Sequence, residues 1–436
     1  MALIVQKFGG SSVADAEHLK RVAARVADAH SKGNKVVVVV SAMGDTTDEL
    51  LDLAAKINDK PRKRELDILM TAGERISMSL LAMAIEKLGV GARAYTGQQA
   101  GIKTDSFYGA ARIVDIDTTR IHKCLELGDV AVIAGFQGIN KDLNDVTTLG
   151  RGGSDTSAVA IAAALDADIC EIYTDVDGVF SADPRIVKSA KKLPVLSYEE
   201  MLEMSASGSK VLALRAVEYG RRFGVPIHVR SSFSELTGTL ICDLDKIGDI
   251  MDRLDDYAED FLTSSLEAPI ISGVAHDSSE AKITINGAID NPGIATKIFE
   301  EIANISANID MIVQNVSHEG VTDISFTLPE NETATVANHL DTLKDTIGFK
   351  KVLVDTEIGK LSLIGAGMKT HSGISAKFFR ALFEAGINIE MITTSEIRIS
   401  VIVRKSDLDA AAIALHSAFD LDGDASEAVV YGGSGR

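Results

Sequence analysis

Apolar runs and amphipathic stretches alternate along residues 1–245. Short runs rich in β-branched residues predict buried strands at 3–8, 35–40, 130–134 and 169–174. Apolar positions at helical spacing predict helices between them, at 14–30, 64–87 and 154–165. Because strands that alternate with helices form parallel sheets, we expect an α/β domain with a mostly parallel central sheet and helices on both faces.

The pattern changes near Asp245, where the segment DKIGDIMDRLDDYAED begins. This segment is acidic, poor in β-branched residues and without a strand pattern, which is typical of a linker. We therefore expect a first domain over residues 1–245 and an acidic linker over residues 246–267.

The remaining sequence contains an internal repeat. Asn291-Pro-Gly-Ile294 recurs 80 residues later as His371-Ser-Gly-Ile374, and Asn308-Ile-Asp-Met-Ile312 recurs as Asn388-Ile-Glu-Met-Ile392. Each unit reads as a strand, a glycine turn, a helix, two strands and a helix, which indicates a small βαββαβ module of the α+β class. We expect two such modules, over residues 268–350 and 351–436, and a paired arrangement is typical of a sensor.

Composition and charge narrow the class of partner. The 436 residues are 46% hydrophobic and 25% charged, the balance of an ordinary globular chain, and their net charge is −19. Such an acidic chain disfavours nonspecific binding to nucleic acid or to an anionic membrane, so we expect a small-molecule substrate. The N-terminal segment lacks a secretory pattern and nothing approaches 18 consecutive apolar residues, so we expect a cytoplasmic location.

The three cysteines, Cys124, Cys170 and Cys242, lie far apart in the sequence. They form neither a CxxC pair nor a cluster with metal-ligand spacing. We expect buried thiols in a reducing compartment and no metal site built by the protein alone.

A glycine-rich segment, Lys7-Phe8-Gly9-Gly10-Ser11-Ser12, comes directly after the first predicted strand and before a helix. Consecutive glycines let backbone amides approach a phosphate, and a helix N-terminus adds partial positive charge. A lysine beside them can neutralise oxygens as charge shifts during transfer. An ordinary strand-to-helix turn has a similar composition, so this segment alone leaves both interpretations open.

A second polar loop, Leu149-Gly150-Arg151-Gly152-Gly153-Ser154-Asp155, runs into an alanine-rich helix. Arg151 offers a planar fork suited to a carboxylate, Ser154 can donate a hydrogen bond, and Asp155 can orient a lysine or hold a metal ion. A polar loop this dense between apolar elements favours a binding site over a purely structural turn.

A third segment, Tyr173-Thr174-Asp175-Val176-Asp177-Gly178-Val179-Phe180, follows the strand at 169–172, and Arg185 lies just beyond it. Ligands bind at the C-terminal ends of strands in open α/β sheets, although a solvated turn rich in Asp and Gly reads the same way. Lys210, in Gly208-Ser-Lys-Val211, either reaches a phosphate or is a solvated lysine.

Two shorter segments complete the set of candidates: Ser41-Ala-Met-Gly44 with Thr47, and Thr71-Ala-Gly-Glu74. Thr47 would bind a carboxylate and Glu74 an ammonium group, and each segment alone also fits a helix cap. The sequence has no GxxxxGK[ST] loop, protein-kinase signature, HExxH or GxSxG. Gly365-Ala-Gly-Met-Lys-Thr370 resembles part of a dinucleotide fingerprint, but Thr370 replaces its third glycine, so we interpret it as a turn of the second module.

The segments KFGGSS, SAMGDTTD, TAGERIS, TTLGRGGSD, YTDVDGVFSADPR and GSK occur in the order seen in aspartate kinases of the amino-acid kinase superfamily. The repeat resembles tandem ACT domains, so the resemblance covers nearly the whole chain. It implies a three-layer kinase domain followed by two ACT-like modules. It also implies transfer of the γ-phosphate of ATP, with Mg²⁺, to the side-chain carboxylate of L-aspartate. That acceptor is already ionised at neutral pH, so the transfer needs no general base.

Carried over position by position, the resemblance implies a role for each candidate residue. Lys7 and Asp155 resemble the charge-stabilising lysine and its organising acid. The substrate contacts it implies are Thr47, Glu74, Arg151, Gly152, Gly153 and Ser154. The ATP contacts it implies are Lys7, Phe8, Gly9, Gly10, Ser41, Thr174, Asp175, Phe180, Arg185, Lys210 and Val211. Phe180 stands where the family often has tyrosine, so no hydroxyl is available there.

The resemblance also implies feedback by lysine, threonine or both, on the pathway to lysine, threonine, methionine and isoleucine. The effector contacts it implies are Asn291, Pro292, Gly293, Ile294, Ala295, Asn308, Ile309, Asp310, Gln314, His371, Ser372, Gly373, Ile374, Asn388, Ile389 and Glu390. These residues also fit plain packing of paired modules. We expect a homo-oligomer through the modules, and Met251 is a candidate internal start for a short subunit. Alternatives are another amino-acid kinase, acting on glutamate or N-acetylglutamate, and a non-catalytic amino-acid sensor.

Overall fold

The computed structural model describes residues 1–253, 271–315, 319–369, 371–423 and 429–431. Of the expected linker, residues 246–253 are described: they complete the short helix η2 (Leu244–Lys246) and form α8 (Ile247–Arg253). The rest of the linker lies outside the described residues.

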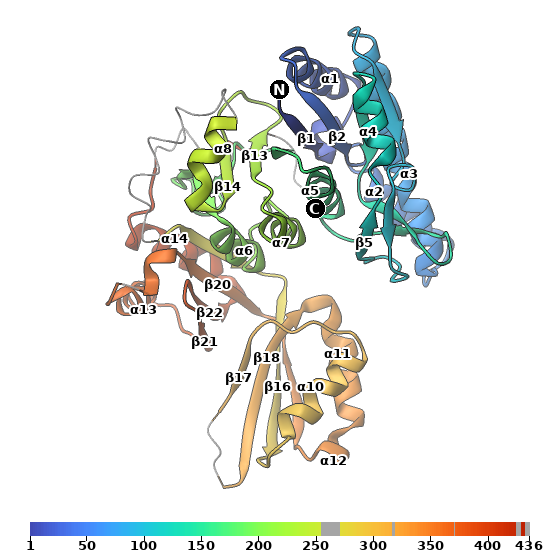
Figure 1. Cartoon of the computed structure of the whole chain (residues 1–436). Helices are drawn as coiled ribbons and strands as arrows, with labels where there is room; N and C mark the ends of the chain where they lie inside the picture. The colour runs from blue at the N-terminus through green and yellow to red at the C-terminus, as the bar shows by residue number, and fades with distance from the viewer. Residues whose placement is uncertain (254–270, 316–318, 370, 424–428, 432–436) are drawn as a thin grey trace.

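An eight-stranded sheet forms the centre of the first domain (Figure 1). The strands expected at 3–8, 35–40, 130–134 and 169–174 are confirmed as β1, β2, β6 and β9. Six neighbouring strands run parallel, and β14 pairs antiparallel with β13. In spatial order the strands are β12 (Val195–Ser197), β14 (Thr239–Cys242), β13 (Ile227–Ser231), β9 (Ile169–Thr174), β1 (Leu3–Phe8), β2 (Lys35–Val40), β6 (Val130–Ala134) and β3 (Ala92–Tyr95).

Helices cover both faces of this sheet, which confirms the expected three layers. On one face, apolar side chains of α1 (Ala16–Ser31) and α3 (Lys63–Glu86) pack on β2 and β6, and α2 (Thr46–Ile57) lies against α3. On the other face, the packed helices are α4 (Thr119–Glu126), α5 (Gly153–Leu165), α6 (Tyr198–Ala206) and α7 (Leu214–Phe223). The alanine-rich sequence of α5 lets it lie buried along most of its length between the sheet and α7.

Smaller elements decorate this domain. A second sheet has the order β5 (Ile113–Ile116), β4 (Ile102–Thr104), β7 (Gln137–Asn140) and β8 (Val146–Thr148). A two-stranded ribbon joins β10 (Val179–Phe180) to β11 (Lys192–Leu193). The segment after β1 forms a short 3₁₀ helix, η1 (Gly10–Val13), and α1 begins only at Ala16, after Asp15 accepts hydrogen bonds from the amides of Glu17 and His18. The single helix expected at 14–30 is therefore shorter, because a capping Asp separates it from the glycine loop.

Helix α3 is long and apolar enough to cross a membrane by those two criteria. It nevertheless buries Asp67 and Glu74 inside the domain and packs on α1 and the sheet. Buried carboxylates with protein partners are typical of a helix in the core of a domain, and α3 is such a helix.

Two four-stranded antiparallel sheets form the C-terminal half. The first module consists of β16 (Glu280–Ile289), α10 (Ile294–Asn304), β17 (Ile312–Gln314), β18 (Val321–Pro329), η3 (Glu330–Glu332), α11 (Thr333–Thr342), α12 (Lys344–Ile347) and β19 (Lys351–Asp355). The second consists of β15 (Gly273–Asp277), β20 (Ile358–Ile364), η4 (Ala366–Lys369), α13 (Ile374–Glu384), β21 (Met391–Thr394), β22 (Arg398–Arg404), η5 (Lys405–Asp407) and α14 (Leu408–Ala418).

The sheets do not follow the expected boundary between residues 350 and 351. Strand β19 pairs with β16 and belongs to the first sheet. Strand β15, which precedes the first module in the sequence, pairs with β20 and completes the second sheet. The first module is thus inserted between the first strand of the second module and the rest of it. The repeat is clear in the sequence only from β16 and β20 onward, so it did not show to which module β15 and β19 belong.

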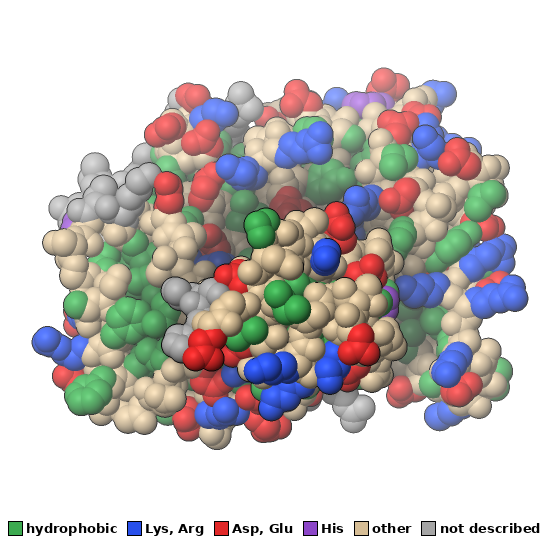
Figure 2. Space-filling view, turned by 90° about the horizontal axis from the view of Figure 1, so that it is seen from below, with side chains coloured by type: hydrophobic (Ala, Val, Ile, Leu, Met, Phe, Trp, Pro, Cys, Tyr) green, Lys and Arg blue, Asp and Glu red, His purple; other side chains and the backbone are tan. Residues whose placement is uncertain are grey.

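The second module and the C-terminal segment contact the first domain directly. The Val274 amide of β15 donates to the Ser181 carbonyl at 2.7 Å, and the Ser181 hydroxyl lies 2.8 Å from Nε2 of His416 on α14. After α14 the chain returns to the first domain, where Val430 bridges to Val176 (Figure 1). On the face seen from below, acidic and basic side chains are interspersed, so this face offers no extended basic surface to a polyanion (Figure 2).

Candidate active site

Three candidate loops meet at one edge of the central sheet. Strand β1 lies between β2 and β9, and all three run parallel, so the segments that follow them leave the same edge. The Gly9 amide donates to the Tyr173 carbonyl at 3.2 Å, and the Gly44 amide donates to the Gly10 carbonyl at 3.1 Å. The order of strands therefore assembles segments that are more than 30 and 160 residues apart in sequence.

Close packing explains why the first loop needs glycine. A Cβ on Gly10 would lie 3.0 Å from the Gly44 carbonyl oxygen and 3.1 Å from that of Ala42. The Gly9 amide, which we expected to face a phosphate, is instead used by Tyr173 because the β1–β9 pairing continues by one more bond. The helix N-terminus nearest the loop is that of η1, which is a single turn. Its partial positive charge would therefore attract a phosphate less strongly than the N-terminus of the longer helix α1 would.

Lys7 and Asp155 connect the first loop to the second. Lys7 Nζ lies 2.6 Å from Asp155 Oδ1, and both side chains are largely buried. Asp155 sits in the first turn of α5, and its other oxygen accepts from the Ala213 amide at 3.4 Å. A buried lysine held by a carboxylate has a fixed position, which is what the stabilisation of charge developing on a phosphoryl group requires.

Glu74 is a buried carboxylate at the same end of the molecule. Its Oε1 accepts from the Ala42 amide at 3.2 Å, while its buried Oε2 has no hydrogen-bond partner among the described residues. Burial raises the pKa of Glu74 to about 7. The contact exists because Gly73 lets α3 approach the 41–44 segment: a Cβ there would lie 2.6 Å from the Ala42 Cβ. A buried carboxylate oxygen without a partner fits an incoming ammonium group.

The start of α5 is shaped by Gly152, which has φ +66° and a Cβ position only 2.3 Å from the Ala213 Cβ. A side chain at 152 would separate α5 from α7 and move Asp155 away from Lys7. Ser154 is buried beside Gly135 at the end of β6, and Arg151 is exposed. Thr47 is half-buried in the first turn of α2.

A cavity of about 620 Å³ lies beside these loops. Its lining includes Arg151 and six of the expected ATP contacts, which are Thr174, Asp175, Phe180, Arg185, Lys210 and Val211. Arg185 is held by Asp183 at 2.6 Å. Lys7, Phe8, Gly9, Gly10 and Ser41 do not line this cavity but belong to the adjoining loops. The C-terminal half also contributes to the wall through Val274, Ala275, His276 and Val430, none of which was expected from the sequence.

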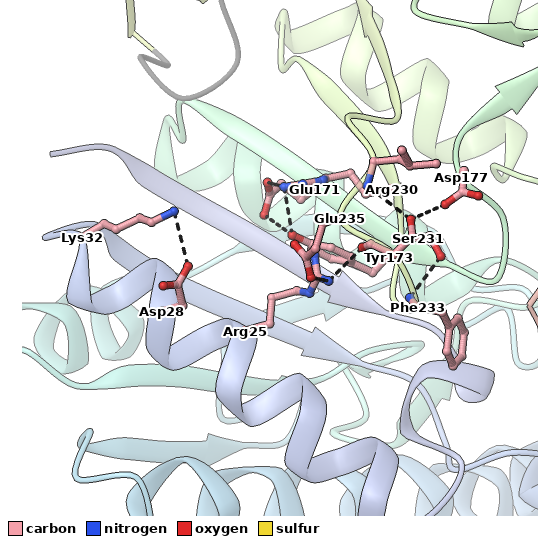
Figure 3. Close-up of polar contacts among 12 residues, drawn as sticks. Arg25, Asp28, Lys32, Glu171, Tyr173, Asp177, Arg230, Ser231, Phe233 and Glu235 are labelled. Carbon is pink, nitrogen blue, oxygen red and sulfur yellow. Dashed lines mark hydrogen bonds and ion pairs between the residues drawn. The ribbon is translucent and has the colours of Figure 1, made fainter. Parts of the chain in front are cut away.

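A polar network that we did not anticipate lies under the loops, on the α1 face of the sheet (Figure 3). The Tyr173 ring stacks on Phe8 with centroids 4.7 Å apart, and the guanidinium carbons of Arg25 and Arg230 lie 5.0 and 5.7 Å from the Tyr173 ring centroid. Arg230 also lies 3.3 Å from Glu171. These contacts fix the strand whose carbonyl binds Gly9, and burial lowers the pKa of the neighbouring His228 to about 4, so its ring is neutral.

The expected effector residues lie on equivalent turns of the two modules. Gly293 and Gly373 have φ near +95° and precede α10 and α13. Asp310 already pairs with Lys360 at 2.6 Å, and Glu390 pairs with Arg404 at 2.6 Å and with Lys282. An effector's ammonium group would therefore compete with these cations, and the effector assignments stay predictions.

Known protein families match this architecture. Residues 2–231 match the amino acid kinase family, and residues 283–342 and 361–419 each match the ACT domain. Fold and site thus define a small-molecule kinase of the amino acid kinase family with paired ACT domains. The aspartokinases of Mycobacterium tuberculosis (strain ATCC 25618 / H37Rv) and Corynebacterium glutamicum are 56% and 54% identical to the chain, each over 438 residues and 100% of both sequences.

The chain belongs to the aspartokinase family, and it is an ATP-using enzyme that phosphorylates the side-chain carboxyl group of aspartate. Solved structures agree with this fold. The aspartate kinase of Synechocystis superposes with a TM-score of 0.52 at 38% identity, covering 97% of this chain and 70% of that one. Aspartokinase III of E. coli, in complex with aspartate and ADP, superposes with a TM-score of 0.78 at 22% identity, covering 95% and 99%.

Proposed function

We propose that the Lys7–Asp155 pair marks the place of phosphoryl transfer, with ATP in the adjoining cavity and L-aspartate between Glu74 and the start of α5. The observation that carries this proposal is the 2.6 Å contact between Lys7 and Asp155, because it joins the two glycine-rich loops in one site. In this arrangement the two reactants lie end to end across the carboxyl edge of the sheet.

Each residue then has a physical role. Lys7, held by Asp155, offsets negative charge on the phosphoryl group as it moves. Glu74 binds the ammonium group of aspartate, and Arg151, Ser154 and Thr47 bind its α-carboxylate, which leaves the β-carboxylate directed at the phosphate. Lys210, Arg185 and Thr174 contact the nucleotide. The acceptor is the ionised side-chain carboxylate of aspartate, so the transfer requires no general base.

Magnesium fits this site as an ion carried mainly by the nucleotide. The described residues contain no cluster of three or more His, Cys, Asp or Glu side chains able to hold a metal alone. Mg²⁺ commonly binds through phosphate oxygens, waters and one or two carboxylates, and Asp175 on the cavity wall is available as such a carboxylate. When bound, the ion neutralises phosphate charge and organises the leaving group.

The direct test is an acceptor panel. Purified protein with MgATP should form an acyl phosphate with L-aspartate, which hydroxylamine traps as a hydroxamate, and much less with L-glutamate or N-acetyl-L-glutamate. Preference for either of these two would replace the substrate assignment. Absence of any ATP turnover, with all three acceptors, would favour a non-catalytic sensor.

We further propose feedback by lysine, threonine or both through the ACT modules, on a pathway that leads from 4-phospho-L-aspartate to lysine, threonine, methionine and isoleucine. Support comes from the paired modules and from the structure of E. coli aspartokinase III in complex with lysine and aspartate. The test is the rate with each amino acid alone and with both together. A rate unchanged by lysine, threonine and their mixture would remove this proposal.

The remaining assignments concern the assembly. We propose a cytoplasmic homo-oligomer formed through the modules, with a short subunit that begins near Met251. A short C-terminal species that disappears in Met251→Leu supports the internal start, and an unchanged band pattern removes it.

A further inference from the structure

A buried lysine ammonium lies where the kinase domain and both modules meet. Lys360, on β20 of the second module, is 1% exposed. Its Nζ donates to the Ala206 carbonyl at 3.1 Å, to Glu280 Oε1 at 2.5 Å and to Asp310 Oδ2 at 2.6 Å. An ammonium group has three N–H donors, and here three acceptors from separate parts of the chain use them all.

The acceptor in the kinase domain is the end of a helix. Ala206 is the last residue of α6, and the final carbonyls of a helix have no intrahelical partner and carry partial negative charge. A cation placed at this end is favourable, and its burial strengthens the interaction. Lys360 therefore binds α6 at its C-terminal end.

The residues that follow α6 form one wall of the nucleotide cavity. Gly208, Ser209 and Lys210 all line it, as does Met204 on α6 itself. Gly208 has φ +112°, and a Cβ there would lie 2.1 Å from the His276 carbonyl oxygen, so this wall rests directly on β15. The wall is thus held on one side by β15 and at its origin by Lys360, and both belong to the second module.

We propose that Lys360 is a positioning residue for ATP: by holding the end of α6, it places the Gly208–Lys210 segment where Lys210 meets the nucleotide phosphates. The inference rests on the proposal that the cavity holds the nucleotide. It assigns to a regulatory module a residue that the kinase reaction needs even when no effector is present.

Charge dictates how the test is built. Removing Lys360 alone leaves the buried Glu280 carboxylate beside Asp310 without a cation, which threatens folding. The Lys360→Met, Glu280→Gln double variant removes one positive and one negative charge, and the remaining Asp310 side chain is partly exposed. Glu280→Gln alone is one control. Lys282→Met is the matched control, because the described partners of Lys282, Glu390 and Asp355, both belong to the modules.

The experiment measures kcat, the KM for ATP, the KM for aspartate and the equilibrium binding of ADP for each purified variant, without effectors. The double variant should raise the KM for ATP and the Kd for ADP by roughly tenfold, the effect of losing one charge-assisted hydrogen bond. Its KM for aspartate should change less than about twofold, because Glu74 and α5 are untouched. Both controls should keep wild-type constants for nucleotide.

A merely structural role predicts a lower melting temperature with unchanged nucleotide constants, and that result overturns the proposal. Equal rises in the double variant and in Lys282→Met overturn it as well. Should the double variant not purify folded, Lys360→Gln with Glu280→Gln, which keeps a polar donor at the junction, decides by the same criteria. Lys210→Ala distinguishes failure of the nucleotide site from failure of the role of Lys360. If Lys210→Ala binds ADP normally, the assignment of the cavity to the nucleotide is wrong. If Lys210→Ala binds ADP more weakly while the Lys360 double variant binds it normally, only the role of Lys360 is refuted.

Discussion

The Glu74 carboxyl group allows a sharp prediction because it is buried, has one unsatisfied oxygen and titrates near neutrality. Its pKa rises from an ordinary 4.5 to about 7 through burial. A shift of this size corresponds to about 3 kcal/mol at about 1.36 kcal/mol per unit. The free protein therefore carries a cost whenever Glu74 is ionised, and the substrate ammonium group should remove it.

The sign follows from proton binding. Between pH 4.5 and 7 the folded state retains a proton on Glu74 that the unfolded state releases, so stability falls as pH rises through this window. The cost is small near pH 5 and complete above pH 7. Glu74→Gln keeps an oxygen to accept from Ala42 but carries no charge, so it should gain up to about 3 kcal/mol over wild type at pH 8 and under about 1 kcal/mol at pH 5.

The assay is the melting transition of the kinase domain for wild type and Glu74→Gln at pH 5 and pH 8. At roughly 2–4 °C per kcal/mol for a domain of this size, the variant should melt about 6–12 °C above wild type at pH 8. The same concentration of aspartate should stabilise wild type more than the variant. In parallel, the KM for aspartate should rise at least about tenfold in Glu74→Gln, the cost of one charged hydrogen bond.

A matched control lies seven residues earlier on the same helix. Asp67 is also buried, which raises the pKa of its carboxyl group, but its oxygens accept from the amides of Gly109 and Thr148 and from the Thr148 hydroxyl, and these hydrogen bonds oppose that rise. Asp67→Asn should therefore lose stability at both pH values. Our reasoning about Glu74 is refuted if its variant shows the same melting difference at pH 5 and pH 8, or if its aspartate KM stays normal.

Three further results are expected. Lys7→Ala should fold and still bind ADP but lose about 10²–10³-fold in kcat, since the positive charge that offsets the moving phosphoryl group is removed; a turnover near wild type would contradict the assigned role. Gly208→Ala should destabilise the protein by more than about 1–3 kcal/mol and weaken ATP binding, because its Cβ would meet the His276 carbonyl oxygen. Gly33→Ala is also at positive φ but lies in open space, so it should show only the cost of the backbone conformation. Equal destabilisation of the two variants in thermal melts would exclude the contact with His276. Lysine and threonine together should inhibit ATP turnover more than either alone, as initial rates with saturating aspartate will show.

Four strands at the centre of the main sheet, β1, β2, β6 and β9, were predictable because they are short, mostly apolar runs. The run Lys35–Val40 is nearly all valine and its neighbours are mostly apolar, and such buried parallel strands leave a strong local signal. Strands β4, β5, β7 and β8 have three or four residues each and carry no such pattern, so the second sheet was not foreseen. The loops after β1, β2 and β9 lie together because these strands are neighbours in the sheet. That order of strands cannot be predicted from local sequence patterns.

The network around Tyr173 shows a signal that sequence reasoning passed over. Gln6, Glu171 and His228 are polar residues inside otherwise apolar strands, and they lie side by side in the register of β1, β9 and β13. A polar residue within a buried strand needs a partner, so three of them predict a shared cluster once the strand order is known. The contribution of β15 to the nucleotide cavity had no comparable signal, because Val274 and Ala275 read as ordinary strand residues.

The insertion of the first module between β15 and the rest of the second module constrains how this protein can be divided or recombined. Separating the chain after residue 350 would strip β19 from one sheet and leave β15 without the neighbours that form the other. The two modules cannot be separated at that point, and a fragment that keeps both of them whole must span residues 273–418 without interruption. The first module is continuous from β16 to β19, so excision between residues 280 and 355 removes a whole sheet, whereas the second module cannot be transferred without β15.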